Sequence, residues 1–395
     1  MKKILKKRSH AAVHAGQQHT DRHQASPDTV LWSDWRWQVR NRIVRLEELE
    51  KWINPNEEER KAVRYSAGRL KMAITPHFAS LMDTDDPWCP IRRQAVPVPD
   101  EFKTSSHDLK DPCGEEKDTV APGLVHRYPD RVLLLITDAC AMYCRHCTRR
   151  RIVGSREGTL TMQQLKEAIH YISKNRKIRD VLISGGDPLL LSDGQLDNLL
   201  GMIREIPHVE IIRLGTRLPV TLPQRFTPEL CNVLSKYHPL YISIHCNHEK
   251  EISVETQHAC NRLTSAGIPL GSQTVLLKDI NDDPKTMMRL MRRLLSVRIR
   301  PYYLYQCDLA PGTEHVRTSV NVGLKIIESL RGHTTGYAVP TYVIDAPGGG
   351  GKVPINPETI IARSKSGIMI RNYQGRIFFY PDTITRTDGQ PSANP

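Results

Sequence analysis

The stretch RVLLLITDACAMYCRHCTRRR, residues 131–151, determines how the rest of the chain is interpreted. Its first seven residues are a short apolar run of the kind that forms a buried strand. Three cysteines follow, Cys140, Cys144 and Cys147, in a C-x3-C-x2-C spacing. Protein-only metal and cluster sites normally use four ligands. Three thiols on one loop therefore leave one position for a ligand from elsewhere.

Two kinds of site suit this spacing. Three thiolates can hold three irons of a [4Fe-4S] cluster and leave the fourth iron open. A zinc knuckle with a distant fourth ligand, His146 or Cys307, is the alternative. The chain has nine cysteines, an odd number with three of them clustered, which does not suggest a disulfide framework.

From residue 131 onward, short apolar runs alternate with amphipathic stretches. Thr161 with Gln164, and Ser192 with Gln195, fit capping boxes at the start of two helices. The predicted strands are 131–137, 180–186, 210–217, 240–246, 270–277, 300–306 and 341–345, and the predicted helices are 161–175, 192–206, 227–237, 254–267, 284–297 and 321–332. About six β/α units with short connections favour a parallel sheet.

The sheet is either doubly wound or a barrel. No G-x-G-x-x-G follows the first strand, which argues against a dinucleotide-binding fold. Polar residues also gather at the carboxyl ends of the predicted strands, which form the active-site rim of β/α barrels. Besides the cysteine loop they are Gly185, Gly186, Asp187, Arg217, His245, Gln273, Asp308 and Asp345. We therefore predict an α/β fold, a partial (β/α)6-type TIM barrel.

A glycine-rich loop, DAPGGGGKV, spans residues 345–353 after the last predicted strand. It is not a Walker A loop, because the glycine spacing fails and Val353 stands where Ser or Thr should coordinate magnesium. A linker with a surface lysine is one interpretation. The other places Lys352 in the barrel mouth, where a partly desolvated amine could form a Schiff base with a carbonyl cofactor.

Composition and charge indicate the domain organisation and the kinds of ligand to expect. We expect a disordered tail over 1–30, a helical region and arm over 31–125, the barrel over 126–347 and a C-terminal extension over 348–395. The net charge of +13 permits an anionic ligand, but the basic residues are dispersed, so nucleic-acid binding is not expected. There is no apolar run long enough to span a membrane and no secretory signal, which predicts a cytoplasmic protein.

Several motifs together resemble the lysine 2,3-aminomutase family of radical S-adenosylmethionine (SAM) enzymes. They are the cysteine loop, SGGD (184–187), QCDL (306–309), DAPGGGGK (345–352) and IRNYQG (370–375), and the resemblance runs from about residue 30 to 380. It implies a radical SAM partial barrel and an isomerase that interconverts L-lysine and β-lysine. It also implies a [4Fe-4S] cluster, S-adenosyl-L-methionine, pyridoxal 5′-phosphate and an electron donor that reduces the cluster.

The resemblance also implies roles for individual residues. Cys140, Cys144 and Cys147 would bind the cluster, and Lys352 would form the Schiff base with pyridoxal phosphate. Arg149 would bind the substrate carboxylate, and Asp308 and Asp345 would bind its ε-ammonium. The other implied cofactor contacts are Arg127 and Arg131 near the phosphate, Gly185, Gly186 and Asp187 near the methionine amino group, and His245 and Gln273 near SAM or pyridoxal phosphate.

The sequence leaves other functions open. A related aminomutase could act on arginine, which also carries a distal cation, or on glutamate, which the two aspartates disfavour. A shorter branch of the family makes β-lysine for elongation factor P. A basic zinc-binding module that contacts nucleic acid is an alternative from another functional class, but it leaves Lys352 and the two aspartates unexplained. No cysteine follows Cys307, so the C-terminal zinc of clostridial relatives is not expected, although a homo-oligomer is.

Overall fold

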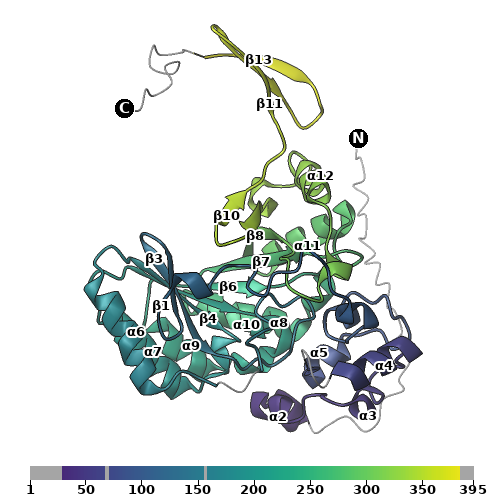
Figure 1. Ribbon diagram of the computed structural model, residues 1–395, viewed down its shortest axis with the longest axis vertical. Coiled ribbons are helices and arrows are strands. Elements are labelled where there is room, and N and C mark those ends of the chain that lie inside the picture. The colour runs from purple at the N-terminus through teal and green to yellow at the C-terminus, as the bar shows by residue number, and fades with distance from the viewer. Residues whose placement is uncertain (1–28, 67–70, 155–157, 383–395) are drawn as a thin grey trace, which may run out of the picture.

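The computed structural model describes residues 29–66, 71–154 and 158–382. Within these ranges the main feature is a ten-stranded sheet whose spatial order follows the chain from β1 to β10 (Figure 1). The strands are β1 (Thr119–Ala121), β2 (Leu124–Tyr128), β3 (Arg131–Thr137), β4 (Asp180–Gly185), β5 (Ile211–Thr216), β6 (Leu240–His245), β7 (Leu270–Leu276), β8 (Ile299–Gln306), β9 (Thr341–Ala346) and β10 (Gly351–Pro354). Strands β3 to β9 are parallel.

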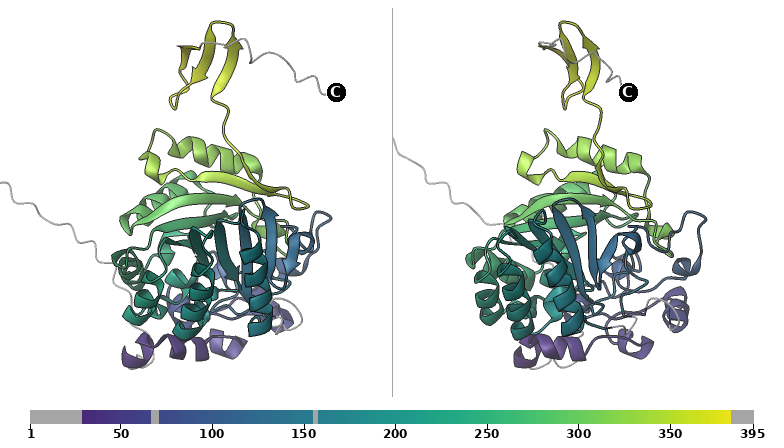
Figure 2. Two further views of the ribbon diagram at one scale, coloured as in Figure 1. Left: turned by 90° about the vertical axis from the view of Figure 1, so that its left-hand side faces the viewer. Right: turned by 60° about the vertical axis from the view of Figure 1, so that its left-hand side comes forward.

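The parallel strands curve into an incomplete barrel (Figure 2). In β3, Val132, Leu134 and Ile136 are at most 3% exposed, whereas Leu133 and Leu135 are half-buried. This period of two places one face against the helices and the other toward the barrel interior. The strand order begins at β1 and ends at β10, so the described sheet keeps two edges. The predicted partial barrel is confirmed.

Helices cover the outer face of the barrel, each following its strand. They are α6 (Met162–Lys174), α7 (Asp193–Arg204), α9 (Pro228–Ser235), α10 (Val254–Ser265), α11 (Pro284–Ser296) and α12 (Val320–Leu330), with a short turn, α8 (Leu218–Thr221), after β5. The predicted capping boxes are present: Thr161 with Gln164 at α6, and Ser192 with Gln195 at α7. No helix in the part of the chain described here is long and apolar enough to cross a bilayer.

The N-terminal region forms a separate layer below the barrel, with α1 (Thr29–Ser33), α2 (Trp35–Arg40), α3 (Leu46–Leu49), α4 (Glu57–Tyr65) and α5 (Pro76–Ser80). It has its own apolar core, which includes Leu49, Ile74 and Phe78. Met142 of the cysteine loop belongs to this core and is 3% exposed. The N-terminal layer therefore packs directly on the cysteine loop. Most of the predicted tail, residues 1–28, lies outside the described residues.

Three strands of the sheet were not predicted. The segment expected as an irregular arm ends in β1 and β2, where β1 pairs antiparallel with β2 and β2 pairs antiparallel with β3. Both are short, are separated by Pro122-Gly123 and carry polar side chains, so they lack the apolar pattern of a strand. β10 likewise lies within the glycine-lysine segment and pairs with β9. These segments are extended because their backbones pair with a neighbouring strand. Their own sequences do not carry the pattern of a strand.

A small antiparallel sheet ends the described chain and stands away from the barrel in Figures 1 and 2. It consists of β11 (Ile360–Ser364), β12 (Gly367–Arg371) and β13 (Ile377–Pro381), and β12 and β13 form a hairpin that pairs Ile368 with Tyr380. All five residues of β13 are exposed.

Candidate active site

The cysteine loop begins at the carboxyl end of β3, as predicted. Two glycines at the end of β4 let the backbone of the cysteine loop pass, because a Cβ at Gly185 would collide with the carbonyl of Thr137, and one at Gly186 with the carbonyl of Ala139. The N–H of Asp187 donates to that same Ala139 carbonyl over 2.7 Å. The close approach of the cysteine loop therefore requires glycine at both positions of SGGD, whether or not a ligand binds there.

Residues of the N-terminal layer hold the other side of the loop. The guanidinium of Arg42 donates to the carbonyl of Cys140 over 2.7 Å. The N–H of Arg145 donates to the carbonyl of Gln94 over 3.0 Å. The Arg145 guanidinium also pairs with the carboxylate of Glu101, and both side chains are at most 3% exposed. The three thiols are thus presented by a backbone fixed on both sides.

The environment of the thiols favours a bound cation. Burial raises the pKa of Cys147 to about 11, and the neighbouring Cys144 sulfur adds to the rise. Burial and the Cys147 sulfur also raise the pKa of Cys140 well above its ordinary value. Buried thiols with raised pKa values, as at Cys140 and Cys147, need positive charge nearby to become thiolates. The donor set therefore fits an iron–sulfur cluster, whose irons supply that charge.

A cavity of about 1140 Å³ runs through the barrel and joins the cysteine loop to the glycine-lysine loop. Its lining includes the three loop cysteines, all the other residues that sequence analysis assigned to the site, and several tyrosines of β8. The structure thus brings the predicted site residues to one cavity. That volume suits cofactor-sized ligands.

Lys352 lies opposite Asp345 in the β9–β10 pairing. Its Nζ is 3.0 and 3.1 Å from the two oxygens of Asp345, and 5.2 Å from the ring centre of Tyr305. Its backbone N–H donates to the Tyr128 hydroxyl over 2.9 Å. Gly348 and Gly349 have φ of +71° and +81°, which only glycine adopts without strain, so the glycines shape the turn that returns Lys352 to the cavity.

The same loop also touches the arm before β1. Gly114 lies so close that an added Cβ would be 2.8 Å from the backbone nitrogen of Gly349, and the Lys117 ammonium donates to the carbonyl of Gly348. These contacts bring the β1–β2 edge and the β10 edge together without strand pairing. We call this contact the seam.

Asp308 and Asp345 converge at the cavity, as expected. One oxygen of each and the sulfur of Cys113 all lie within 4.8 Å of one another. Burial, and then the neighbouring charge of Asp345, raise the pKa of Asp308 to about 6. Two carboxylates this close repel each other, and a cation between them relieves the repulsion.

Arg149 has a carboxylate partner within the protein. Its guanidinium contacts both oxygens of Glu115, at 2.7 to 3.1 Å, and its Nη1 is 3.4 Å from the Ser184 hydroxyl. Burial opposes the charged form, but Glu115 outweighs it and raises the pKa of Arg149 above its ordinary value. The arginine is therefore a permanent cation at the cavity wall, oriented by Glu115.

The remaining predicted cofactor contacts differ in what they touch. Arg127 pairs with Asp118 and donates to the carbonyl of Gly114 over 2.8 Å. Arg131, at the amino end of β3, stacks on the Tyr128 ring at 3.9 Å. Gln273 is 3.4 Å from the Tyr305 hydroxyl. All of these predicted residues line the cavity.

Asp187 is engaged by the barrel itself. Its carboxylate accepts from the Thr216 hydroxyl at 2.8 and 2.9 Å and from the backbone N–H of Arg217 at 2.7 Å. Burial raises its pKa to about 6, although these donors oppose the rise. Asp187 thus ties the end of β4 to the end of β5.

His245 lies against His146, with 3.0 Å between their Nε2 atoms, and burial lowers the pKa of both rings well below the ordinary value. Cys307, the other zinc ligand considered, packs among apolar side chains such as Leu277 and Val316.

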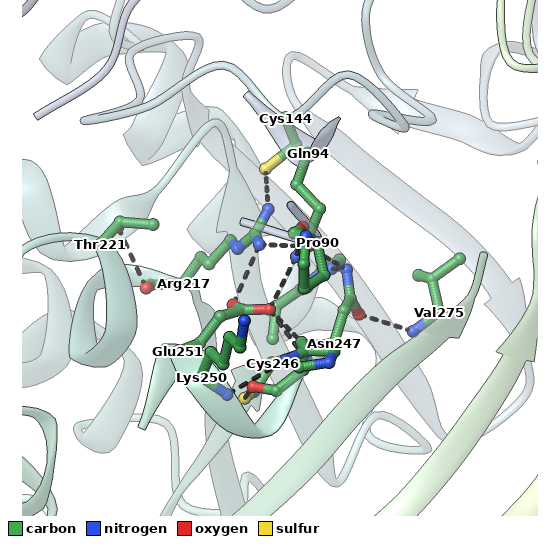
Figure 3. A network of polar contacts seen from close by, with 12 residues as sticks. Pro90, Gln94, Cys144, Arg217, Thr221, Cys246, Asn247, Lys250, Glu251 and Val275 are labelled. Carbon is green, nitrogen blue, oxygen red and sulfur yellow. Dashed lines mark hydrogen bonds and ion pairs between the residues drawn. The ribbon is translucent and has the colours of Figure 1, made fainter. Parts of the chain in front are cut away.

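Several residues at the site were not assigned a role from the sequence. Figure 3 shows the largest group, in which the Arg217 guanidinium lies between Cys144 and Glu251 and also contacts Gln94. Arg217 follows a predicted strand, which was a usable signal. Gln94 and Glu251 come from short 3-10 helices, and Cys113 and Glu115 from the arm before β1, and none of these segments carries a sequence motif.

Comparisons with known proteins agree with this geometry. The family model described as Lysine-2,3-aminomutase matches residues 327–393, and that of the Radical SAM superfamily matches residues 134–291. An L-lysine 2,3-aminomutase of Fusobacterium nucleatum subsp. nucleatum is 54% identical, covering 89% of this chain and 83% of that protein. The corresponding protein of Clostridium subterminale is 53% identical, with coverage of 91% and 86%.

A glutamate 2,3-aminomutase of Clostridioides difficile is 43% identical, covering 89% of this chain and 83% of that protein. The shared length therefore includes the N-terminal layer as well as the barrel. Identity of this extent, together with the converging cysteine and lysine loops, shows that the chain belongs to the lysine 2,3-aminomutase family of radical SAM enzymes.

Proposed function

We propose that the protein is an isomerase that interconverts L-lysine and β-lysine by moving the amino group between C2 and C3. One observation carries the choice of lysine. The ammonium of Lys352 donates a hydrogen bond to the carboxylate of Asp345. A carboxylate oxygen of Asp308 lies within 4.8 Å of a carboxylate oxygen of Asp345. This pocket therefore accommodates the end of a lysine side chain, supplied in the structure by the protein itself.

The cofactors follow from the family and fit the residues present. Cys140, Cys144 and Cys147 would hold a [4Fe-4S] cluster, the cavity beside the loop would take S-adenosyl-L-methionine, and Lys352 would hold pyridoxal 5′-phosphate. When bound, these groups supply hydrogen abstraction from the substrate and an electron sink for the migrating amino group. Cluster reduction requires a low-potential one-electron donor.

The protein's own part is to hold the substrate at both ends. Asp308 and Asp345 would bind the distal ammonium, and Arg149 the carboxylate. Because Glu115 already occupies the guanidinium of Arg149, the substrate would share or replace that partner. Two charged anchors limit the motion of the carbon chain between them, and the enclosing barrel excludes water.

The direct test is a product assay. The protein would be reconstituted without oxygen with iron, sulfide and pyridoxal phosphate, reduced, and given S-adenosylmethionine with L-lysine, L-arginine or L-glutamate separately. β-Lysine from lysine alone is the expected product. A β-amino acid from arginine or glutamate instead would keep the reaction class and overturn the substrate assignment. Absence of product with a full cluster would contradict the proposed reaction.

Assembly and location are parts of the same proposal. The exposed apolar residues of β13, including Phe378 and Phe379, favour association with further copies of the chain, because monomers rarely expose such a patch. All nine cysteines are free. Free thiols and an oxygen-sensitive cluster suit the reducing cytoplasm.

A further inference from the structure

Arg217 is a polar residue at the barrel rim to which the proposed chemistry assigns no role. It follows β5, is 7% exposed, and lines the central cavity. Its Nη1 donates to the sulfur of Cys144 over 2.7 Å. A buried guanidinium beside a cluster ligand is costly unless its charge and its donors are used.

The second arm of the guanidinium is fixed in place. Nη2 donates to Gln94 over 2.6 Å and to Glu251 over 3.0 Å, and both acceptors belong to fully buried side chains. The carboxylate of Glu251 also accepts from the amide of Gln94 and from the backbone of Asn247. Figure 3 shows the resulting network, with Cys144 at one end. This network prevents Arg217 from turning away from the sulfur.

We propose that Arg217 is a positioning residue that sets the reduction potential of the cluster through its hydrogen bond to Cys144. The inference rests on the proposed function, since it requires the cluster. The hydrogen bond reaches Cys144, so an iron held by Cys144 would lie closer to the cationic donor than irons held by the other two thiolates. Hydrogen bonds to the sulfurs and nearby charge are known determinants of cluster potential.

The direction of the effect follows from charge. One-electron reduction makes the cluster and its thiolates more negative, and a cationic donor stabilises the more negative state. Replacing Arg217 with methionine removes that donor and leaves the nearby Glu251 carboxylate without its cationic partner. The reduction potential should therefore become more negative. Arg217→Lys keeps a cation but not the two-armed contact, so its potential should lie between those of Arg217→Met and the parent.

The test is an EPR-monitored redox titration of the anaerobically reconstituted full-length chain, with iron and sulfide content measured on each sample. Arg217→Met and Arg217→Lys are compared with the parent. Arg225→Met is the matched control, because Arg225 is equally buried and paired with Asp193 but contacts no loop cysteine. Its potential should equal that of the parent.

The outcomes separate the two proposals. A parent that assembles no cluster overturns the proposed function itself. A loaded Arg217→Met variant with the parent's potential overturns only the role of Arg217. If that variant does not fold, judged by circular dichroism, Arg217→Lys decides: a lowered potential supports the proposal, and an unchanged one overturns it.

Discussion

The carboxylate of Asp345 has two cationic partners in this proposal, the Lys352 ammonium seen in the structure and the ε-ammonium of the substrate. Lys352 must leave Asp345 before the substrate can occupy the same position. Both hydrogen bonds of the Lys352 ammonium are to Asp345 rather than Asp308. Asp308 is therefore the better residue for testing recognition of the distal ammonium.

Asp308→Asn should reduce kcat/KM for L-lysine by about 30-fold or more, because loss of one partner of a buried charge pair costs about 2 kcal/mol or more. The change keeps the shape and removes only the charge. Steady-state kinetics of the reconstituted variant would measure it, with bound pyridoxal phosphate as the control quantity. Parent-like kcat/KM would show that Asp308 does not bind the ammonium.

The pH dependence follows from the same group. Because burial and Asp345 raise the pKa of Asp308 to about 6, the free enzyme protonates this carboxyl as the pH falls through 6. Below that pH the ammonium loses one of its two counter-charges, so kcat/KM for lysine should fall. The profile of Asp308→Asn should lose this acidic limb. An identical limb in both proteins would assign it to another group, such as Asp187.

Sequence patterns placed the loop cysteines, Lys352 and the two aspartates at one cavity because each stands at a strand end or in a glycine-rich loop. They did not assign roles to Cys113, Glu115, Glu251 or Gln94, which reach the site from segments distant in the chain. Glu115, for example, meets Arg149 only after the arm has folded over the barrel rim. Contacts of this kind form between segments that are distant in the chain, so they leave no periodic pattern in the sequence.

At the scale of elements, the N-terminal layer is part of the site. It supplies Arg42, Ala73, Gln94 and Glu101, all of which contact the cysteine loop or its flanks. The helices and parallel strands of the barrel were predicted well because their periodicity and caps are local. β1, β2 and β10 were missed because only their neighbours make them strands.

Glu101→Gln should weaken retention of the cluster. Glu101 pairs with both Arg145 and Arg150 at the end of the cysteine loop and is 1% exposed. Leaving two buried arginines without their counter-charge should cost about 3 kcal/mol or more of folding stability. Iron content after desalting and thermal unfolding would both be measured.

Asp100→Asn is the matched control for that experiment. The neighbouring Asp100 pairs with Lys103 at the surface, where an ion pair contributes about 1 kcal/mol or less. Its iron content should equal that of the parent. Equal retention in Glu101→Gln would mean that the N-terminal layer does not stabilise the loop.

At the scale of the whole molecule, the barrel, the N-terminal layer and the β11–β13 sheet differ in how they are stabilised. The first two have apolar cores of their own. The terminal sheet instead exposes most of its apolar side chains, and its Tyr373 ring lies against His333 at the end of α12, with 5.5 Å between ring centres.

Replacing Phe378 and Phe379 with serine should reduce self-association, because both rings are about half exposed on β13. Light scattering coupled to size-exclusion chromatography would report the mass of parent and variant over a range of concentrations. Turnover by the variant should persist at saturating lysine, since neither residue lines the cavity. An unchanged mass would exclude this face as the contact between copies.

The seam between the arm and the glycine loop has a kinetic consequence. A continuous ring of strand hydrogen bonds would trap a bulky group inside until the barrel itself came apart. Here the wall is joined at the seam by the Gly114–Gly349 contact and the Lys117–Gly348 hydrogen bond, and beside them by the hydrogen bond from the Lys352 N–H to the Tyr128 hydroxyl. Opening at that place alone would let a large molecule enter or leave sideways. The residence time of whatever is attached to Lys352 would then depend on a few weak contacts, while the fold persists unchanged.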